Sequence, residues 1–272
     1  MDDFYDRTLR HLIQDGVLPR ETRVLVACGG TTDRDVFQRL GFANVTISNI
    51  DSRMTGNEFA PYAWSYQDAE NLSYPDNAFD VIVTHNGLHH CHSPHRALLE
   101  MYRVARQSVL IFEPRDTALV RLGTRLDFGQ EYEVAAVAGN DLQFGGVRNT
   151  PIPNYVYRWT ERELEKTLSA YAPLGRPQLR FFYALRVPEE RLAAMKNRFA
   201  AGTLRRMLPL LRVLTFLFPR QANCFAFLVH KLQLPRDLHP WLTMDNGVPA
   251  IRREWVAARY GDFKPSGLKP QS

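Results

Sequence analysis

The stretch Arg23-Val-Leu-Val-Ala-Cys-Gly-Gly-Thr-Thr-Asp33 decides the fold of this chain. Its first half is an apolar run typical of a buried strand, and the run ends in a tight turn that contains Gly29 and Gly30. A helical pattern follows, and residues 44–50 then alternate apolar and polar side chains up to Asp51. This order is typical of a site for a nucleotide-like cofactor, because backbone approaches the ligand at the turn and the acid accepts hydrogen bonds from ribose hydroxyls.

Strand and helix patterns alternate as far as Pro114. We expect strands over 23–28, 44–50, 62–66, 79–84 and 109–112. We expect helices over 4–13 and 94–104, and a third helix that begins with a cap at Thr31 or Thr32 and ends at Gly41. Two later strands, 179–187 and 224–231, are expected to form an antiparallel pair at one sheet edge. The predicted fold class is therefore α/β, a Rossmann-like, doubly wound and mostly parallel sheet with an antiparallel edge.

The pattern changes after Pro114. Residues 116–158 are mixed and contain five glycines, and a long excursion of this kind in a compact domain is often a lid. We predict a cofactor-binding domain made of 1–188 and 221–232, with 116–158 as a lid or acceptor-binding insertion. Residues 189–220 form a helical insertion in this scheme, and 233–272 form a C-terminal extension.

Composition limits the classes of function. The formal net charge of +5 is explained by an ordinary solvated surface, and no RNA-binding motif or zinc-finger pattern accompanies it, so nucleic acid is not an expected partner. The three cysteines are far apart in sequence, and the acidic N-terminus lacks an apolar signal core. The apolar segment 207–218 is too short to span a bilayer. These features predict a cytoplasmic location.

Four pieces in order carry a resemblance to a known family. They are Val24-Leu-Val-Ala-Cys-Gly29, Asp51, Gln67-Asp-Ala-Glu-Asn-Leu72, and Phe79-Asp-Val-Ile-Val-Thr-His-Asn-Gly-Leu-His-His90. In these residues the chain resembles class I S-adenosylmethionine-dependent methyltransferases, of the small-molecule group related to the ubiquinone-biosynthesis type. The resemblance covers about residues 20–115, and a weaker resemblance extends over 160–187. It implies S-adenosylmethionine as the cofactor.

The resemblance also implies site residues. The turn Ala27-Cys28-Gly29 would pass beneath the amino-acid part of the cofactor. Asp51 would accept hydrogen bonds from the ribose hydroxyls, and Ser52 would flank the adenine. Asp68 would accept the adenine amino group, with the backbone of Ala69 close to the ring.

His85 follows the fourth predicted strand, and the resemblance implies a place near the methionine moiety. The chain departs from the family pattern in the turn, because Val26 replaces the usual acid, and Ala27 and Thr31 replace usual glycines. Asp33 offers a nearby acid in compensation, although an acid in the first turn of a helix commonly only serves the helix dipole.

A cluster of histidines lies after the fourth strand. His89 and His90 are the candidates for a general base, because the segment after this strand faces the transferred methyl group in this fold. The family often carries Leu-His-His here without a metal, and the sequence offers no second ligand cluster, so no metal is expected. A structural or capping role is the default for the other histidines of the segment.

The predicted activity is O-methylation of a small-molecule acceptor, such as a sugar or natural product, in small-molecule biosynthesis. Three alternatives stay open: transfer to nitrogen or carbon, a degenerate ligand-binding fold without catalysis, and a membrane-peripheral enzyme for lipid-linked acceptors with 207–218 at the lipid surface. Core packing or a homodimer interface is the other expectation for 207–218. The sequence after the fourth strand, His85-Asn86-Gly87-Leu88, lacks the Asn/Asp-Pro-Pro-aromatic run usual for the N-methylating subset. The sequence does not identify the acceptor, the oligomeric state or the role of 189–220 and 233–272.

Overall fold

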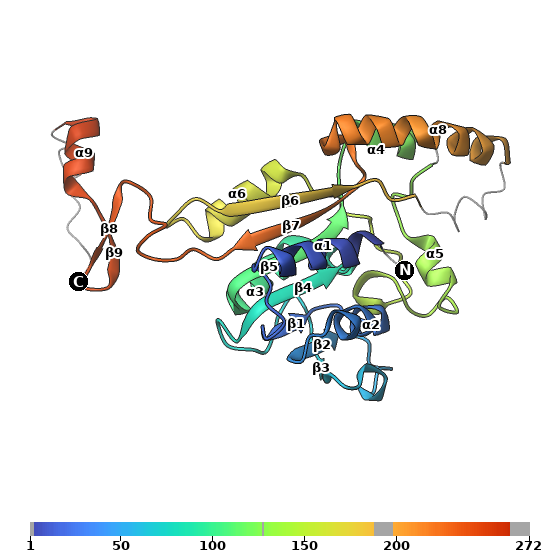
Figure 1. Ribbon diagram of the computed structural model, residues 1–272, viewed down its shortest axis with the longest axis horizontal. Helices are drawn as coiled ribbons and strands as arrows, with labels where there is room; N and C mark the ends of the chain where they lie inside the picture. The colour runs from blue at the N-terminus through green and yellow to red at the C-terminus, as the bar shows by residue number, and fades with distance from the viewer. Residues whose placement is uncertain (1–2, 127, 188–197, 262–272) are drawn as a thin grey trace.

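The computed structural model describes residues 3–126, 128–187 and 198–261, and its centre is one seven-stranded sheet (Figure 1). The strand order is β3-β2-β1-β4-β5-β7-β6. Strands β1 to β5 are parallel to their neighbours among themselves, and β7 is antiparallel to both β5 and β6. The strands are β1 (Val24–Val26), β2 (Val45–Asn49), β3 (Ala63–Tyr66), β4 (Phe79–His85), β5 (Ala105–Pro114), β6 (Gln178–Ala184) and β7 (Cys224–His230). The predicted mostly parallel sheet with an antiparallel edge is confirmed.

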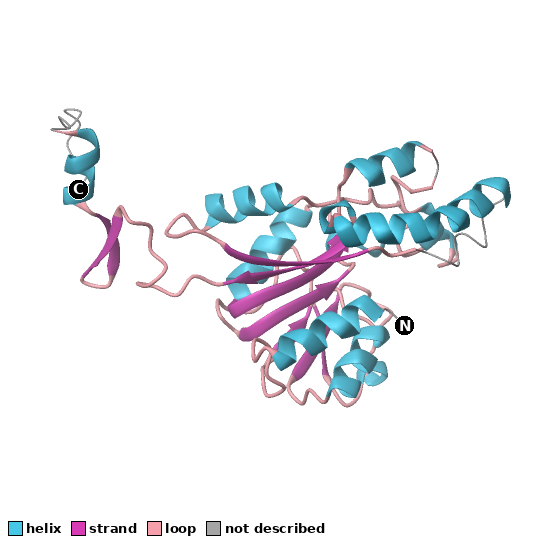
Figure 2. Ribbon diagram, turned by 45° about the horizontal axis from the view of Figure 1, so that its top comes forward, coloured by secondary structure: helices cyan, strands magenta, loops and turns pink. Residues whose placement is uncertain are grey.

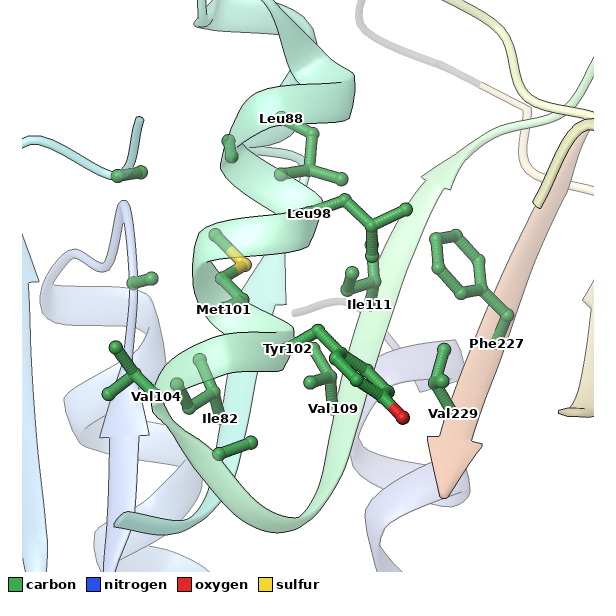
Figure 3. Close-up of a cluster of buried hydrophobic side chains, with 14 of the residues drawn as sticks. Ile82, Leu88, Leu98, Met101, Tyr102, Val104, Val109, Ile111, Phe227 and Val229 are labelled. Atoms are coloured by element: carbon green, nitrogen blue, oxygen red, sulfur yellow. The ribbon is translucent and has the colours of Figure 1, made fainter. Parts of the chain in front are cut away.

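Helices cover both faces of the sheet (Figure 2). On one face α1 (Asp3–Gln14) and α2 (Thr31–Leu40) pack against Val81 and Val83 of β4, and on the other α3 (Pro94–Val104) and α6 (Glu161–Tyr171) pack around Ile82. Figure 3 shows how Leu98 and Met101 of α3 meet the side chains of β4, β5 and β7. A strand buried on both faces reads as a continuous apolar run, which explains the sequence of β4.

The start of α2 differs from the expectation. The N-cap is Gly30 rather than Thr31 or Thr32, and its N–H donates to Oδ2 of Asp33 at 2.8 Å. Gly41 ends the helix with φ of 79°, a left-handed conformation that glycine adopts readily. The glycine turn therefore leads directly into the helix without a hydroxyl cap.

The segment 116–158 lies at the edge where the parallel strands end (Figure 1). It contains α4 (Ala118–Arg125), α5 (Val134–Ala138) and the 3-10 turn η3 (Val147–Asn149). The described side chains of α4 include none that is buried, and α5 buries only Val137. Two further 3-10 turns lie near this edge, η1 (Asn57–Phe59) and η2 (Leu88–His90).

Residues 198–221 form α8 (Arg198–Leu217) and the short turn η4 (Pro219–Gln221), and the beginning of the predicted helical insertion, 189–197, lies outside the described residues. Helix α8 lies along the surface of the body beside α4 in both ribbon views. Among the helices of the described ranges, none is both long and apolar enough to cross a membrane.

The C-terminal extension stands apart from the sheet (Figures 1 and 2). It is a hairpin of β8 (Leu242–Asp245) and β9 (Val248–Ile251) followed by α9 (Arg253–Tyr260). Trp241 and Trp255 contact each other, with ring centroids 5.6 Å apart, so they join the hairpin to its own helix. Residues 262–272 of the predicted extension lie outside the described part of the chain.

Candidate active site

A pocket of about 240 Å³ lies beyond the carboxyl ends of β1, β2, β3 and β4. This is where ligands bind in open α/β sheets. The lining residues come from four strand-end loops and from residues 116–158, the predicted lid segment. They are Cys28, Asn49, Ile50, Asp51, Gln67, Asp68, Ala69, Glu70, Asn86, Gly87, His90, Cys91, Gly145, Gly146, Arg148 and Asn149.

The turn after β1 forms the floor of the pocket. Cys28 lines the cavity in a left-handed conformation with φ of 55°, whereas Ala27 is fully buried beneath it. A Cβ atom on Gly29 would lie 2.8 Å from a methyl carbon of Val26 and 2.9 Å from one of Ile47, so only glycine fits there. Alanine is accommodated at position 27, where the family usually has glycine, because its backbone continues the hydrogen bonding of the sheet. The N–H of Ala27 donates to the carbonyl of Val83.

Asp51 lines the pocket at the end of β2 and is almost fully buried. Arg53 holds both of its carboxylate oxygens, with Nε to Oδ1 at 2.9 Å and Nη2 to Oδ2 at 2.6 Å. The Arg53 guanidinium lowers the pKa of Asp51 below its usual value, and a hydrogen bond from Asn149 acts in the same direction. The carboxylate is thus ionised and faces the pocket.

Asp68 and Ala69 also line the pocket, after β3. Asp68 Oδ1 accepts the backbone N–H of Glu70 at 2.9 Å, and Oδ2 lies 2.9 Å from Nη1 of Arg148. The same arginine nitrogen lies 3.1 Å from Oε2 of Glu70. The two acids predicted from the strand ends therefore share one cavity.

The lid segment supplies residues that sequence reasoning missed. Arg148 and Asn149 contact the two acids, and the ring of Phe144 lies 3.9 Å from the guanidinium carbon of Arg53. Gly145 and Gly146 close the same side of the pocket. The glycine content of 116–158 pointed to a lid, but no local pattern identifies which of its side chains meet the strand ends.

Five predicted residues are not among the lining residues: Ala27, Gly29, Ser52, His85 and His89. The ring of His85 stacks on Tyr5 of α1 with centroids 4.4 Å apart and meets the edge of Phe112, on the face of the sheet that α1 covers. The reason is the two-residue period of a strand, which places His85 with Val81 and Val83. Ser52 is exposed and is not among the lining residues.

Asp33 does not replace the missing acid of the turn. Its carboxylate is buried, and it accepts hydrogen bonds from the N–H of Gly30 and the hydroxyl of Tyr5. Burial raises the pKa of Asp33 above its usual value. The acid caps the helix and joins α1 to α2, away from the cavity.

His89 is buried behind the pocket wall. Its Nδ1 lies 2.6 Å from Oε2 of Glu113, which is fully buried at the end of β5 and also accepts the N–H of Leu88 at 2.7 Å. Burial alone would lower the pKa of His89, but Glu113 and Glu133 outweigh it and raise the pKa to about 10. The hydrogen bond to Glu113 fixes the orientation of the ring.

His90 is half-buried and lines the pocket. Its Nε2 lies 3.3 Å from Oε2 of Glu133 in the lid segment, and Nε2 of His89 lies 3.5 Å from the same oxygen. Burial and the neighbouring His89 lower the pKa of His90. Burial opposes ionisation of Glu133, but the two histidines lower its pKa to about 2. His90, a predicted candidate for the general base, therefore borders the cavity beside the carboxylate of Glu133.

Two cysteines that are distant in sequence meet in the pocket. Cys28 and Cys91 both line it, and Gly87 packs between their loops, where a Cβ atom would lie 2.5 Å from the Cβ of Cys28. A hydrogen bond with Cys28, followed by burial, raises the pKa of the Cys91 thiol. Both are free cysteines, and their side chains fill this side of the floor as small apolar groups.

Residues 24–112 match the sequence model of a methyltransferase domain. This part of the chain is a class I S-adenosylmethionine-dependent methyltransferase domain. The match spans β1 to β5 and so includes the turn, both pocket acids and the two histidines of η2. The ubiquinone-type subgroup stays a prediction. Comparison with curated protein sequences gives no match.

Over most of its length, this chain is similar in fold to several solved structures. A putative methyltransferase from Bacillus halodurans C-125 is 14% identical, with a TM-score of 0.51 over 84% of this chain and 100% of that one. The YcgJ protein from Bacillus subtilis is 16% identical, with a TM-score of 0.50 over 84% and 99%. The [4+2]-cyclase SpnF is 18% identical, with a TM-score of 0.50 over 83% and 80%. These similarities show the fold alone, and one of them is to a cyclase.

Proposed function

We propose that the enzyme transfers the methyl group of S-adenosylmethionine to an oxygen atom of a small-molecule acceptor, such as a sugar or natural product, held beneath residues 116–158. The observation that carries this proposal is one pocket lined by Asp51, Asp68 and His90. The acids suit the adenosine half of the cofactor, and the imidazole suits the acceptor. The methyl group would lie between them.

In this proposal the turn Ala27-Cys28-Gly29 runs beneath the amino-acid part of the cofactor. Asp51 accepts the ribose hydroxyls, and Asp68 accepts the adenine amino group beside the backbone of Ala69. Arg53 and Arg148 now hold these two carboxylates. Cofactor binding would exchange these ion pairs for hydrogen bonds from neutral donors to the same carboxylates, so the arginines must move aside when it binds.

Methyl transfer is an in-line displacement at the sulfonium. The acceptor hydroxyl loses its proton at the cluster of His89, His90 and Glu133, and its oxygen forms a bond to the methyl carbon. The carbon–sulfur bond breaks, its electron pair stays on sulfur, and S-adenosylhomocysteine leaves. The protein contributes alignment, exclusion of water by the lid, and a site for the proton.

Oxygen is favoured over nitrogen by the polar, proton-accepting groups of the pocket, because an aliphatic hydroxyl is a weak nucleophile until it loses its proton, whereas a neutral amine attacks through its own lone pair. Transfer to nitrogen or carbon is the alternative, and the lack of an N-methylation signature after β4 weighs against the first of these.

A second candidate acceptor class is lipid-linked. Helix α8 exposes Met207, Leu210, Val213 and Phe216, and no acidic residue occurs over 198–220, where arginines recur. An apolar helix face with arginines and no acids suits an anionic bilayer. Such a surface would bring the enzyme to an acceptor carried by a lipid.

The test has two stages. Isothermal titration with S-adenosylmethionine should give one site per chain, and failure of folded protein to bind would end the proposal. Purified enzyme should then transfer radiolabelled methyl from the cofactor into small molecules of a cell extract, with His90→Ala lowering the rate by about 10²- to 10⁴-fold. His92→Ala is the matched control, because its side chain is exposed two residues away. Bound cofactor without any methyl transfer would instead favour a degenerate ligand-binding fold.

A further inference from the structure

Three side chains beside the pocket converge on one point. Nε2 of His89, Nε2 of His90 and Oε2 of Glu133 all lie within 4.8 Å of one another. The histidines come from η2, directly after β4, and the glutamate comes from the lid 43 residues later, just before α5. In the described ranges this is the one group of histidine, cysteine and acidic side chains close enough to hold a metal ion.

The spacing of the two imidazole–carboxylate pairs suits a tetrahedral ion. The two imidazole-to-carboxylate distances are 3.5 and 3.3 Å, longer than the usual 2.7–3.2 Å of an N–H···O bond. Ligands about 2.0–2.1 Å from a tetrahedral zinc ion lie about 3.3–3.4 Å from each other. An octahedral ion with bonds of about 2.1 Å would draw neighbouring ligands to about 3.0 Å.

Each of the three groups is held by an outer partner, as metal ligands commonly are. Nδ1 of His89 donates to the buried carboxylate of Glu113 at 2.6 Å, and His90 hydrogen-bonds with the backbone of Gly146. Oε2 of Glu133 accepts Nδ2 of the buried Asn154 at 3.2 Å. The bond from Nδ1 of His89 to Glu113 turns its Nε2 toward Glu133, which is the order of atoms in a carboxylate–histidine–zinc arrangement.

We propose that His89, His90 and Glu133 bind one zinc ion, whose open fourth position faces the pocket. Two imidazoles and one carboxylate with an open position form the ligand set of catalytic zinc sites, and Glu113 supplies a second negative charge behind them. His90 borders the cavity, so an acceptor oxygen can reach the fourth position. This inference rests on the proposed function, to which it adds how the acceptor is activated.

The bound ion changes one step. The acceptor hydroxyl coordinates zinc, its O–H bond breaks and the proton passes to solvent. The zinc-bound oxygen then forms the bond to the methyl carbon while the carbon–sulfur bond breaks and its electron pair remains on sulfur. The ion undergoes no change of oxidation state, so the step needs no oxidant or reductant.

The proposal also assigns a purpose to the lid. Glu133 is the ligand that comes from residues 116–158, while Arg148 of the same segment contacts Asp68 across the pocket. Because the lid supplies a zinc ligand, the zinc site is complete only when the lid is closed. The closed lid then also excludes water from the reaction.

The experiment uses the full chain, stripped of metal with a chelator and re-equilibrated with Zn²⁺ in the presence of a competing chromophoric chelator. One zinc ion per chain is expected, with binding at least about 100-fold weaker in Glu133→Gln and in His90→Gln. Glu131→Gln is the matched control, because this glutamate is exposed two residues away. With Co²⁺ in place of zinc, the visible absorption should have the intensity of a four-coordinate ion, and Glu133→Gln should remove it.

Unfolding temperature and S-adenosylmethionine affinity are measured on the same samples to show that each variant is folded. Folded, cofactor-binding protein that takes up no zinc would overturn the metal site and leave the methyltransferase proposal standing. Equal zinc affinity in wild type, Glu133→Gln and His90→Gln would also overturn the site. Zinc binding by a protein that binds no cofactor would support the site and contradict the proposed function.

Discussion

At the scale of single residues, the pocket acids are paired with arginines of different origin. Arg53 is two residues from Asp51 and belongs to the same loop, whereas Arg148 reaches Asp68 from the lid. The Arg53–Asp51 pair lies within one loop at the end of β2. The Arg148–Asp68 pair requires residues 116–158 to pack against the end of β3. In the proposed function, cofactor binding would therefore disturb one local contact and one contact between the sheet and residues 116–158.

We expect Asp51→Asn to weaken S-adenosylmethionine binding by about 10- to 100-fold, because hydrogen bonds to a charged acceptor contribute about 1.5–3 kcal/mol. Isothermal titration measures the change. Asp35→Asn is the control, since this acid is exposed on α2 and pairs only with the neighbouring Arg34 among the described contacts. Equal affinity in wild type and Asp51→Asn would remove Asp51 from the ribose site.

Asp33 gives a prediction for pH. The pKa of its buried carboxyl is raised, so the folded state binds this proton more tightly than the unfolded chain does. The contribution of the group to stability is therefore greatest below the unfolded pKa of 3.8 and is lost as pH rises through the folded value. Asn at position 33 can still accept from Gly30 and donate to the Tyr5 hydroxyl, and it never ionises.

The stability of Asp33→Asn relative to wild type should therefore increase from pH 3.5 to pH 7 in urea denaturation, with His85 as the nearby titratable group to monitor. Cofactor affinity should stay within about twofold of wild type, because Asp33 does not line the pocket. A relative stability that falls over this pH range would contradict the assignment.

The same residues show what sequence can and cannot predict about a site. Asp51 and Asp68 were predictable because each follows a short strand, and parallel strands end at one edge. The two-residue period of β4, which is visible in the sequence, places His85 on the same face as Val81 and Val83. Glu133 and Arg148 could not be found, because their partners are 43 and 80 residues away and no periodic pattern links them.

At the scale of elements, the parallel sheet followed from apolar runs that alternate with helical patterns, and these are strong signals in long buried segments. Strand β5 is longer than expected because it begins at Ala105, directly after α3, with the exposed Arg106 and Gln107 inside it. The lid helices α4 and α5 bury little, so no apolar stripe marked their boundaries.

Gly146 tests whether the lid acts as one unit. A Cβ atom there would lie 1.9 Å from the carbonyl oxygen of Ile152, so Gly146→Ala must displace η3 and with it Arg148. We expect methyl transfer to fall by about 10²-fold, because small displacements of positioning groups have effects of this size. The unfolding temperature should change little, since few lid side chains are buried.

The control is Gly139→Ala at the end of α5, where the nearest atom to a new Cβ would be the carbonyl oxygen of Ala135 at 3.4 Å and φ is −75°. This variant should keep both activity and cofactor affinity. If Gly146→Ala were as active as Gly139→Ala, the lid would not need this turn for the reaction.

At the scale of the whole molecule, the methyltransferase body carries two peripheral parts with different surfaces. The C-terminal hairpin and α9 contact each other through Trp241 and Trp255 and stand away from the sheet. Helix α8 instead lies on the body, with α4 beside it and Leu122 and Leu126 of that segment also exposed. The apolar exposed surface nearest the lid is therefore shared by α8 and the α4 segment.

This surface gives the last prediction. Wild-type protein should co-sediment with vesicles that contain anionic lipid, less at high salt, because arginines and apolar side chains act together at a bilayer surface. Leu210 and Phe216 are 64% and 83% exposed, and changing both to Ser should lower partitioning by about 10- to 100-fold. Val248→Ser is the control, since Val248 is 64% exposed in the C-terminal hairpin. A different result would contradict this prediction: wild-type protein that does not bind vesicles but forms a dimer, while the double variant is monomeric. That result would show that a second copy of the chain covers α8 instead.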